Sequence, residues 1–245
     1  MFMRECLSCQ GLGRWSRFAV VMALMLFAWS PASLKALTLP GVTWSAVYGF
    51  ANGSTADDSG NGNTLSALSG SPAFVSDRRI LGRTGPLAGF NPASNQLTLS
   101  AWIKTSSSGK EVIATMGRNS SSNEGEWVWG ISGGRLYFWD YRGGYGFPDG
   151  AFTSTTSVNN GQWRHVAFVR NGLTGAFYID GIYAGTTTAS QNISYTNLDL
   201  VMGGDYRDST LYWTGQLDDV SVSSAALTAA RFPEWRRGRQ LRSAD

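Results

Sequence analysis

Residues 161–167 read Gly-Gln-Trp-Arg-His-Val-Ala, residues 177–181 read Phe-Tyr-Ile-Asp-Gly, and residues 213–220 read Trp-Thr-Gly-Gln-Leu-Asp-Asp-Val. In each stretch, the side chains would alternate between the two faces of a short strand. A Gly or Asp, which favours a turn, lies at the end of the stretch or beside it. Alternation with a period of two, bounded by turn residues, is typical of a half-buried β-strand. The three stretches therefore predict strands in the second half of the chain.

Short runs of the same kind follow one another through most of the sequence. They are rich in Val, Ile, Thr and aromatic residues, and clusters of Gly, Asn, Asp and Ser separate them. The predicted strands are residues 97–104, 126–131, 134–141, 162–170, 175–179, 198–203 and 215–222. Asn171-Gly172 and Asp180-Gly181 lie between neighbouring runs and are dipeptides that form tight turns. This pattern predicts an all-β fold, a two-sheet antiparallel sandwich.

The first part of the 245-residue chain has the pattern of a secretory signal peptide. Three arginines precede an unbroken apolar run at residues 18–29, and small residues follow as far as Ala36. The run is shorter than the ~20 apolar residues that a helix needs to cross a bilayer. We therefore expect residues 1–36 to be removed from a secreted or periplasmic protein with one domain at residues 37–232. The alternative is an uncleaved N-terminal anchor.

The charge distribution bears on the possible partners, and the cysteine content bears on disulfides. The formal net charge of +3 comes from the two ends of the chain, and residues 37–232 are slightly acidic. A nucleic-acid partner requires a basic face across a domain, so the sequence counts against one. Cys6 and Cys9 lie in the predicted leader, so the exported domain would lack disulfides. The arginine-rich residues 233–245 are predicted to be a disordered tail.

Three further phrases carry a family resemblance: Val-Tyr-Gly-Phe at residues 47–50, Asp-Asp-Ser-Gly-Asn-Gly-Asn at residues 57–63, and Leu-Ser-Ala-Trp-Ile-Lys-Thr at residues 99–105. With the three opening phrases, they resemble the laminin-G-like jelly roll of the concanavalin A-like group across residues 42–232. The resemblance implies a jelly-roll sandwich with a short helix near residues 225–232. The chain departs from the family at residues 221–223, which read Ser-Val-Ser where Arg-Ile-Tyr is usual. Because most such modules bind sugars or proteins without reacting with them, the resemblance implies binding.

A glycine-rich loop contains Asp57, Asp58 and Asn61, whose side-chain oxygens are ligands that calcium accepts. The resemblance adds an aspartate of the closing strand, Asp218 or Asp219, as a partner for this loop. We therefore predict a structural calcium site formed by Asp58, Asn61 and Asp219. The alternative is a turn built from residues suited to turns, with no bound ion.

An aromatic segment at residues 136–149 is the strongest indication of a ligand. From Leu136 to Tyr141, alternation puts the odd-numbered residues on one side of a strand and the even-numbered residues on the other. Sugar rings pack against aromatic planes, and Asp and Arg bond their hydroxyl groups. The predicted ligand-binding residues are Trp139, Asp140, Tyr141, Arg142 and Tyr145, with Tyr206 and Arg207 from a second aromatic cluster. The alternative is that Tyr137 and Trp139 belong to an ordinary core.

Candidate catalytic groups are few. His165 is the only histidine, and on a strand we expect it to be a core residue rather than a general base. Glycoside hydrolysis usually needs two carboxylates at a fixed separation, and Glu124 and Glu126 are the nearest approach to such a pair. We therefore predict an exported, non-catalytic module that binds carbohydrate through aromatic-rich loops. A protein-interaction or adhesion module, and a divergent glycoside hydrolase or polysaccharide lyase, remain as alternatives.

Overall fold

The structure of the chain is a computed structural model. All the residues that it describes belong to one compact unit, Leu34–Asp245. They are residues 42–50, 54–66, 82–91, 95–117, 126–141, 153–192, 195–205, 210–228 and 231. The predicted signal peptide at residues 1–36 and the predicted tail at residues 233–245 lie outside them.

The described residues form twelve strands and no α-helix, which confirms the prediction of an all-β fold. The strands are β1 (Ala46–Tyr48), β2 (Gly82–Pro86), β3 (Gln96–Lys104), β4 (Glu111–Met116), β5 (Glu126–Ser132), β6 (Arg135–Tyr141), β7 (Thr153–Ser157), β8 (Arg164–Asn171), β9 (Thr174–Ile179), β10 (Ile182–Thr188), β11 (Asp199–Met202) and β12 (Gln216–Ser223).

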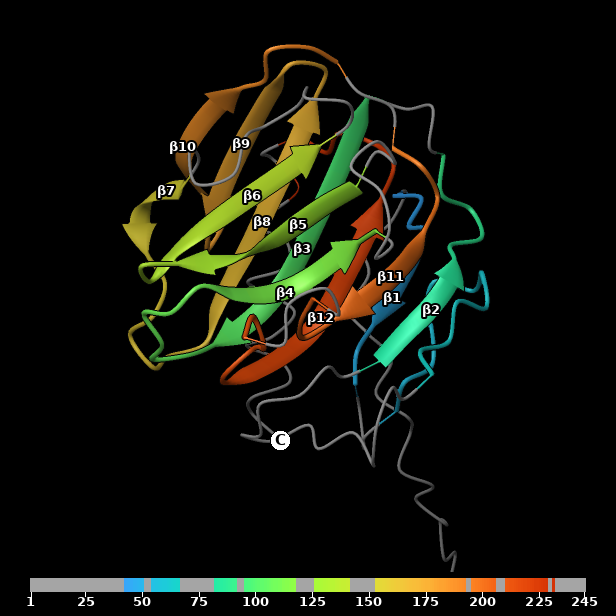
Figure 1. Cartoon of the computed structure of the whole chain (residues 1–245), viewed down its shortest axis with the longest axis horizontal. Helices are drawn as coiled ribbons and strands as arrows, with labels where there is room; N and C mark the ends of the chain where they lie inside the picture. The colour runs from blue at the N-terminus through green and yellow to red at the C-terminus, as the bar shows by residue number, and fades with distance from the viewer. Residues whose placement is uncertain are drawn as a thin grey trace, which may run out of the picture. The chain divides into compact units, whose positions relative to one another are not determined.

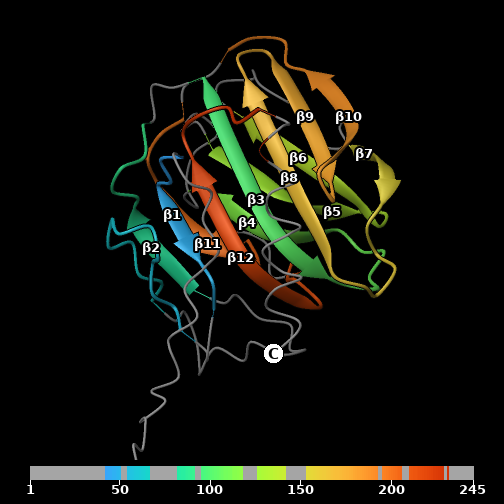
Figure 2. The same ribbon diagram turned by 180° about the vertical axis from the view of Figure 1, so that it is seen from behind.

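The strands form two antiparallel six-stranded sheets. The sheet of order β2-β11-β4-β5-β6-β7 faces the viewer in Figure 1, and the sheet of order β1-β12-β3-β8-β9-β10 faces the viewer in Figure 2. The two sheets are stacked face to face, so the predicted two-sheet sandwich is confirmed. Neighbours in a sheet are often distant in sequence, such as β12 and β3, which is typical of a jelly roll.

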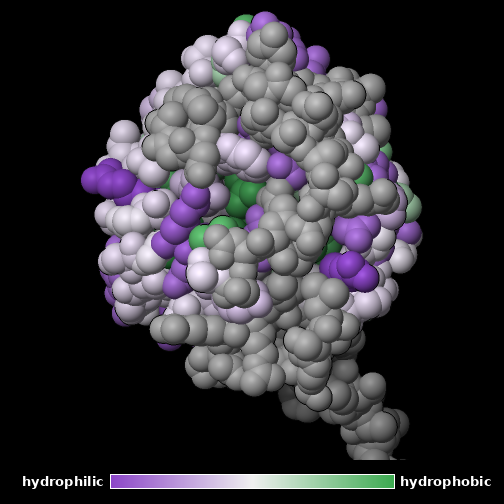
Figure 3. All heavy atoms as spheres, viewed as in Figure 1, coloured by the Kyte–Doolittle hydropathy of each residue, from purple (hydrophilic) through white to green (hydrophobic). Residues whose placement is uncertain are grey.

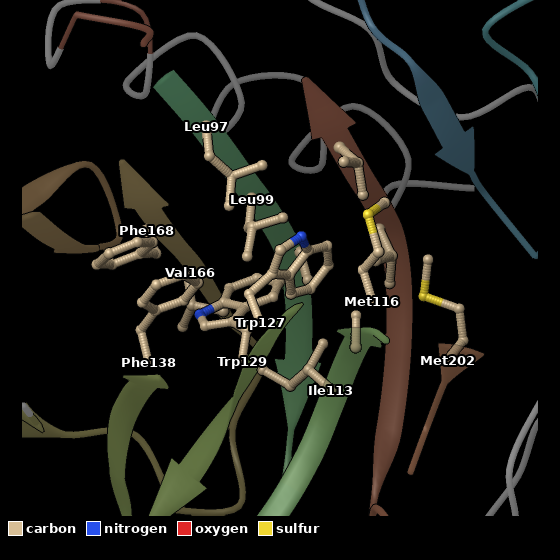
Figure 4. Close-up of a cluster of buried hydrophobic side chains, with 14 of the residues drawn as sticks. Leu97, Leu99, Ile113, Met116, Trp127, Trp129, Phe138, Val166, Phe168 and Met202 are labelled. Carbon is tan, nitrogen blue, oxygen red and sulfur yellow. The ribbon is translucent and has the colours of Figure 1, made fainter. Parts of the chain in front are cut away.

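The space between the sheets is filled by large aromatic and aliphatic side chains. Trp127, Trp129 and Phe138 of one sheet point toward Leu99 and Phe168 of the other (Figure 4). The rings of Phe138 and Phe168 stack across the layers with centroids 3.8 Å apart. Burying one such side chain contributes about 1.5–3 kcal/mol, so this cluster is a main source of stability in a domain without disulfides.

Two tight turns form at or beside the positions that the sequence predicts. Asn171 ends β8 and Gly172 begins the turn to β9, one position later than predicted, whereas Asp180-Gly181 is the whole turn between β9 and β10. Asp180 and Gly181 have φ angles of 52° and 76°. Two consecutive positive φ angles match the twist of the flanking strands, which is why an Asp-Gly dipeptide suits this hairpin.

The short helix expected near residues 225–232 does not begin at Ala225, so its predicted start was wrong, whereas Arg231 near its predicted end has 3₁₀ structure. Residues 225–228 have no helical structure, and the Arg231 N–H bonds the Thr228 carbonyl in a single turn. The Thr98 hydroxyl of β3 donates to the Ala225 carbonyl and accepts from the Leu227 N–H, at 2.6 and 3.0 Å. These bonds to the sheet take the place of the bonds that a helix would form within itself.

Candidate functional site

The outer face of β4, β5 and β6 carries the aromatic residues that the sequence singled out. On β6, Leu136 and Phe138 point into the core, while Tyr137 and Trp139 lie on the opposite, outer face. The predicted alternation is therefore confirmed for these residues. Trp139 lies directly across from Val128 of β5 in the strand register.

Trp139 is partly exposed on this outer face, whereas Tyr137 is 3% exposed. The Lys110 Nζ lies 5.1 Å from the centroid of the Tyr137 ring, a cation–π contact. Figure 3 shows a small hydrophobic surface near the middle of the same face, with hydrophilic residues beside it. An aromatic plane next to polar groups can pack against the C–H face of a sugar ring while the polar groups bond its hydroxyls.

Lys110 was not singled out by the sequence analysis. It immediately precedes β4, a strand whose sequence does not alternate clearly, so no pattern placed Lys110 beside β6. Leu211, between β11 and β12, was missed as well. It packs against the same outer face, and its carbonyl accepts from the Val112 N–H of β4 at 3.1 Å. Only the three-dimensional structure brings these residues to Tyr137 and Trp139.

Asp140 lies on the other side of β6, in the interior. One of its carboxylate oxygens is paired with the Arg170 Nη1 and accepts a hydrogen bond from the Tyr195 hydroxyl at 2.7 Å. The side chains of Asp140 and Arg170 are both 0% exposed. Burial, together with the Asp140 carboxylate, raises the pKa of Tyr195 well above its usual value. Asp140 therefore stabilises the core and does not face the outer surface with Trp139.

The remaining predicted ligand residues are only partly located. The backbone of Tyr141 ends strand β6. Arg142, Tyr145, Tyr206 and Arg207 lie outside the described residues.

The predicted calcium loop is held together by the carboxylate of Asp57. Its two oxygens accept hydrogen bonds from the N–H groups of Val47, Ser59 and Asn63, at 2.9–3.0 Å, and from the Ser59 hydroxyl at 2.8 Å. Four donors around one carboxylate satisfy it without a cation. The Asn61 side-chain N–H group bonds the Trp44 carbonyl at 2.9 Å.

The three residues predicted to bind calcium differ in their surroundings. Asp58 is partly exposed, Asn61 is exposed, and Asp219 is 1% exposed with a φ of 47°. In the part of the chain that the structure describes, no three His, Cys, Asp or Glu side chains gather where they could hold a metal ion. A calcium ion here would therefore depend on amide and carbonyl oxygens as well as carboxylates.

His165 lies on the outer face of the sheet that contains β8, next to Trp102 of β3. The residue is 0% exposed, its Nε2 is 2.8 Å from the Ser100 hydroxyl, and its ring makes an edge contact with Trp102. Desolvation by burial lowers the pKa of His165 to about 3. The imidazole is therefore neutral and shielded from solvent, as expected for a structural histidine.

The lowered pKa of His165 predicts a pH-dependent stability. Below pH 6.5 the unfolded chain takes up a proton on this histidine, while the folded protein resists it until about pH 3. The unfolded state then binds more protons, so stability decreases as the pH falls. Between pH 7 and pH 5 the free energy of unfolding should drop by about 2 kcal/mol. Urea denaturation at both pH values measures it, and an equal drop in a His165→Gln variant would refute this origin.

The two described glutamates, Glu111 and Glu126, are far apart on the other sheet, which contains β4 and β5. Glu111 begins β4 and pairs with Ile131, whereas Glu126 is at the opposite end of β5. Five residues of strand separate them, which corresponds to about 17 Å. Paired carboxylates of glycosidases lie roughly 5 to 10 Å apart. Glu111 and Glu126 therefore do not form such a pair, and Glu124 lies outside the described residues.

The described residues contain no helix with the length and apolar character needed to cross a membrane. No curated protein matches the sequence. Among solved structures, the chain is similar to domain 4 of AbnA, a GH43 extracellular arabinanase from Geobacillus stearothermophilus, in complex with arabinotriose. The identity is 18%, the TM-score is 0.56, and the match covers 78% of this chain and 97% of that domain.

The chain is also similar to the binding domain of botulinum neurotoxin DC, solved in complex with SialylT and in complex with rat synaptotagmin II. The identity is 12% in both, the TM-scores are 0.52 and 0.53, and 80% of this chain is covered. The match spans about half of those toxin chains, 51% and 52%. These likenesses show a shared fold.

A family model described as the concanavalin A-like lectin/glucanases superfamily, Laminin_G_3, matches residues 83–231. This range includes eleven of the twelve strands in whole or part, from β2 to β12. The matched region also contains Trp139 and the whole outer face described above. The chain belongs to the concanavalin A-like lectin/glucanases superfamily.

Proposed function

We propose that the chain is a non-catalytic carbohydrate-binding module that uses the outer face of β4, β5 and β6. The observation that carries this proposal is the partly exposed ring of Trp139, beside Tyr137 and Lys110 on the face seen in Figure 3. An aromatic side chain in the core needs no exposed surface, whereas one that stacks on a sugar does. Similar folds are found in complex with arabinotriose and with SialylT, which supports a carbohydrate ligand.

We also propose that the chain does not cleave the carbohydrate, because its two described glutamates cannot act as a catalytic pair. Both carboxylate oxygens of Glu111 are bonded by groups of the protein, Ser107 and Thr214. Glu126 is about 17 Å away and so cannot act with it. An assay of polysaccharide degradation with wild-type protein and a Glu126→Gln variant tests this point, since glycanase activity that the substitution abolishes would contradict it.

Replacing Trp139 by alanine should weaken polysaccharide binding by about 10-fold or more, because stacking on a sugar ring is lost. Affinity electrophoresis in gels containing arabinan, xylan, mixed-linkage glucan or polygalacturonate measures the binding. Tyr183→Ala is the matched control, because Tyr183 is a 57% exposed aromatic residue on β10 of the other sheet. Equal retardation of wild type and the Trp139 variant in every gel would overturn the assignment.

A protein-interaction module is the second candidate, and the exposed pair Ile182 and Tyr183 favours it. These residues are 64% and 57% exposed at the start of β10, an edge strand. Exposed apolar side chains on a sheet edge are suited to contact another protein. In a pull-down from the native host, a partner captured by the wild type and lost with Ile182→Ser and Tyr183→Ser would favour this function. A partner that is lost only with Trp139→Ala would not favour a protein-interaction module that uses Ile182 and Tyr183.

The proposal places the domain outside the cytoplasm, with a structural calcium ion as a further prediction. N-terminal sequencing of protein from the native host tests for cleavage near Ala36. For calcium at Asp58, Asn61 and Asp219, the expected result is a higher melting temperature in calcium than in a chelator, because a bound ion stabilises the native state. Equal melting temperatures in calcium and in the chelator would contradict a calcium site, and the loop would then be held by the hydrogen bonds of Asp57 alone.

A further inference from the structure

A second concave site lies at one end of the sandwich, where β3 ends and β4 and β12 begin. Its volume is about 650 Å³, which is within the range of roughly 300–1,000 Å³ typical of small-molecule sites. It is lined by Lys104, Thr105, Ser106, Ser107, Glu111, Gly161, Thr214, Gly215 and Gln216. None of the described lining residues is aromatic, so this pocket differs chemically from the face around Trp139.

One group of lining residues forms a rigid frame. Glu111 accepts hydrogen bonds from the Ser107 hydroxyl at 2.6 Å and from the Thr214 N–H at 2.8 Å. The Thr105 hydroxyl donates to the Thr214 carbonyl at 2.7 Å and accepts from the Ser107 N–H at 3.0 Å. These bonds tie the segment after β3 to the segment before β12. These polar groups are therefore already hydrogen-bonded within the protein.

Gly215 allows the two segments to approach this closely. Its φ is 135°, and a Cβ atom there would lie 2.2 Å from the Lys104 carbonyl oxygen. Such a contact is impossible for any other residue without moving the backbone. The walls of the pocket are therefore fixed before a ligand arrives, which lowers the entropic cost of binding.

A second group of lining side chains has no such hydrogen bonds among the residues that the structure describes. Within the described part of the chain, no hydrogen bond or ion pair engages the side chains of Lys104, Ser106 and Gln216. Lys104 is partly buried, and Gln216 is its direct neighbour across β3 and β12. A partly buried ammonium group is stabilised by an anion, and a hydroxyl and an amide can bond the hydroxyl groups of a ligand.

We propose that this pocket binds a carboxylate-bearing, hydroxylated ligand of the uronic acid class. Lys104 pairs with the carboxylate, and Ser106 and Gln216 bond the hydroxyls. Glu111 does not compete for Lys104, because the two lie outside ion-pair distance and each Glu111 oxygen has a donor of its own. The site is separate from the proposed carbohydrate face and adds charge recognition to it.

Titration calorimetry with the full chain tests this inference, with glucuronate and glucose as probes at low and high salt. Glucuronate should bind about 10-fold more tightly than glucose, and 1 M salt should reduce the difference. Lys104→Met should abolish the preference, and Gln216→Ala should weaken both probes. Leu173→Ala, an exposed residue in the turn between β8 and β9, should leave glucuronate binding unchanged. The polysaccharide assay of Trp139→Ala is a separate measurement, so failure of this site and failure of the proposed function are distinguishable.

Two results would overturn the inference. One is equal affinity of the wild type for glucuronate and glucose, including no binding of either. The other is unchanged glucuronate affinity in Lys104→Met. If Lys104→Met does not fold, as judged by its thermal transition, Lys104→Gln and Gln216→Ala take its place. Unchanged glucuronate binding in both of these variants would be equally decisive against the pocket.

Discussion

Replacing Asp140 by alanine should lower the free energy of unfolding by about 3–5 kcal/mol. The substitution leaves the guanidinium of Arg170 in the core, where both side chains are 0% exposed, without its negative partner. It also removes the acceptor of the Tyr195 hydroxyl. An unpaired buried charge is among the most costly defects that a single substitution can create. Urea denaturation followed by tryptophan fluorescence measures the change.

Two variants make the Asp140 prediction specific. Asp199→Ala breaks a 3.7 Å pair between Asp199 and Arg83, whose side chain is 52% exposed, and should cost less than about 1 kcal/mol. The double variant Asp140→Leu with Arg170→Met removes both buried charges and should recover most of the loss. A loss below about 1 kcal/mol for Asp140→Ala would show that Arg170 and Asp140 are not a buried pair.

Gly130→Ala should destabilise the protein by about 3 kcal/mol, because β4 and β5 approach too closely for any side chain there. A Cβ atom at Gly130 would lie 1.9 Å from the Glu111 carbonyl oxygen and 2.9 Å from the Val112 Cα. Both are backbone atoms that cannot rotate away. The two strands would have to separate next to the register shift between Val112 and Ala114.

The matched control for Gly130 is Gly85 of β2. A Cβ atom at Gly85 would meet no atom within 4 Å, so Gly85→Ala should be within about 0.5 kcal/mol of the wild type. Thermal unfolding of both variants by circular dichroism is the measurement. Similar melting temperatures for Gly130→Ala and the wild type would contradict the close approach of β4 to β5.

The strands that were predicted from sequence are those with one clear apolar face. The predicted run at residues 126–131 became β5, whose Trp127 and Trp129 fill the core. Strands β2 and β7 were missed because they are edge strands with few or no apolar residues. Strand β4 was missed because its sequence, Glu-Val-Ile-Ala-Thr-Met, places apolar residues side by side and so does not alternate clearly.

The candidate site was predictable only in part. Alternation along β6 put Tyr137 and Trp139 on one face and Asp140 on the other, but it could not show which face meets the core. Nor could it show that Arg170, thirty residues away in the chain, reaches Asp140. The polar pocket around Lys104 gave no signal, because its lining residues come from separate segments that converge only in the folded sheet.

The central claim is that carbohydrate binds at Trp139. Tryptophan indole N–H signals in nitrogen-15 NMR spectra test it directly, during titration with oligosaccharides from the four polysaccharides named above. The account predicts that the Trp139 signal shifts with at least one saccharide, while the signals of Trp127 and Trp129, both 0% exposed, do not. A Trp139 signal that stays unmoved in every titration would contradict it.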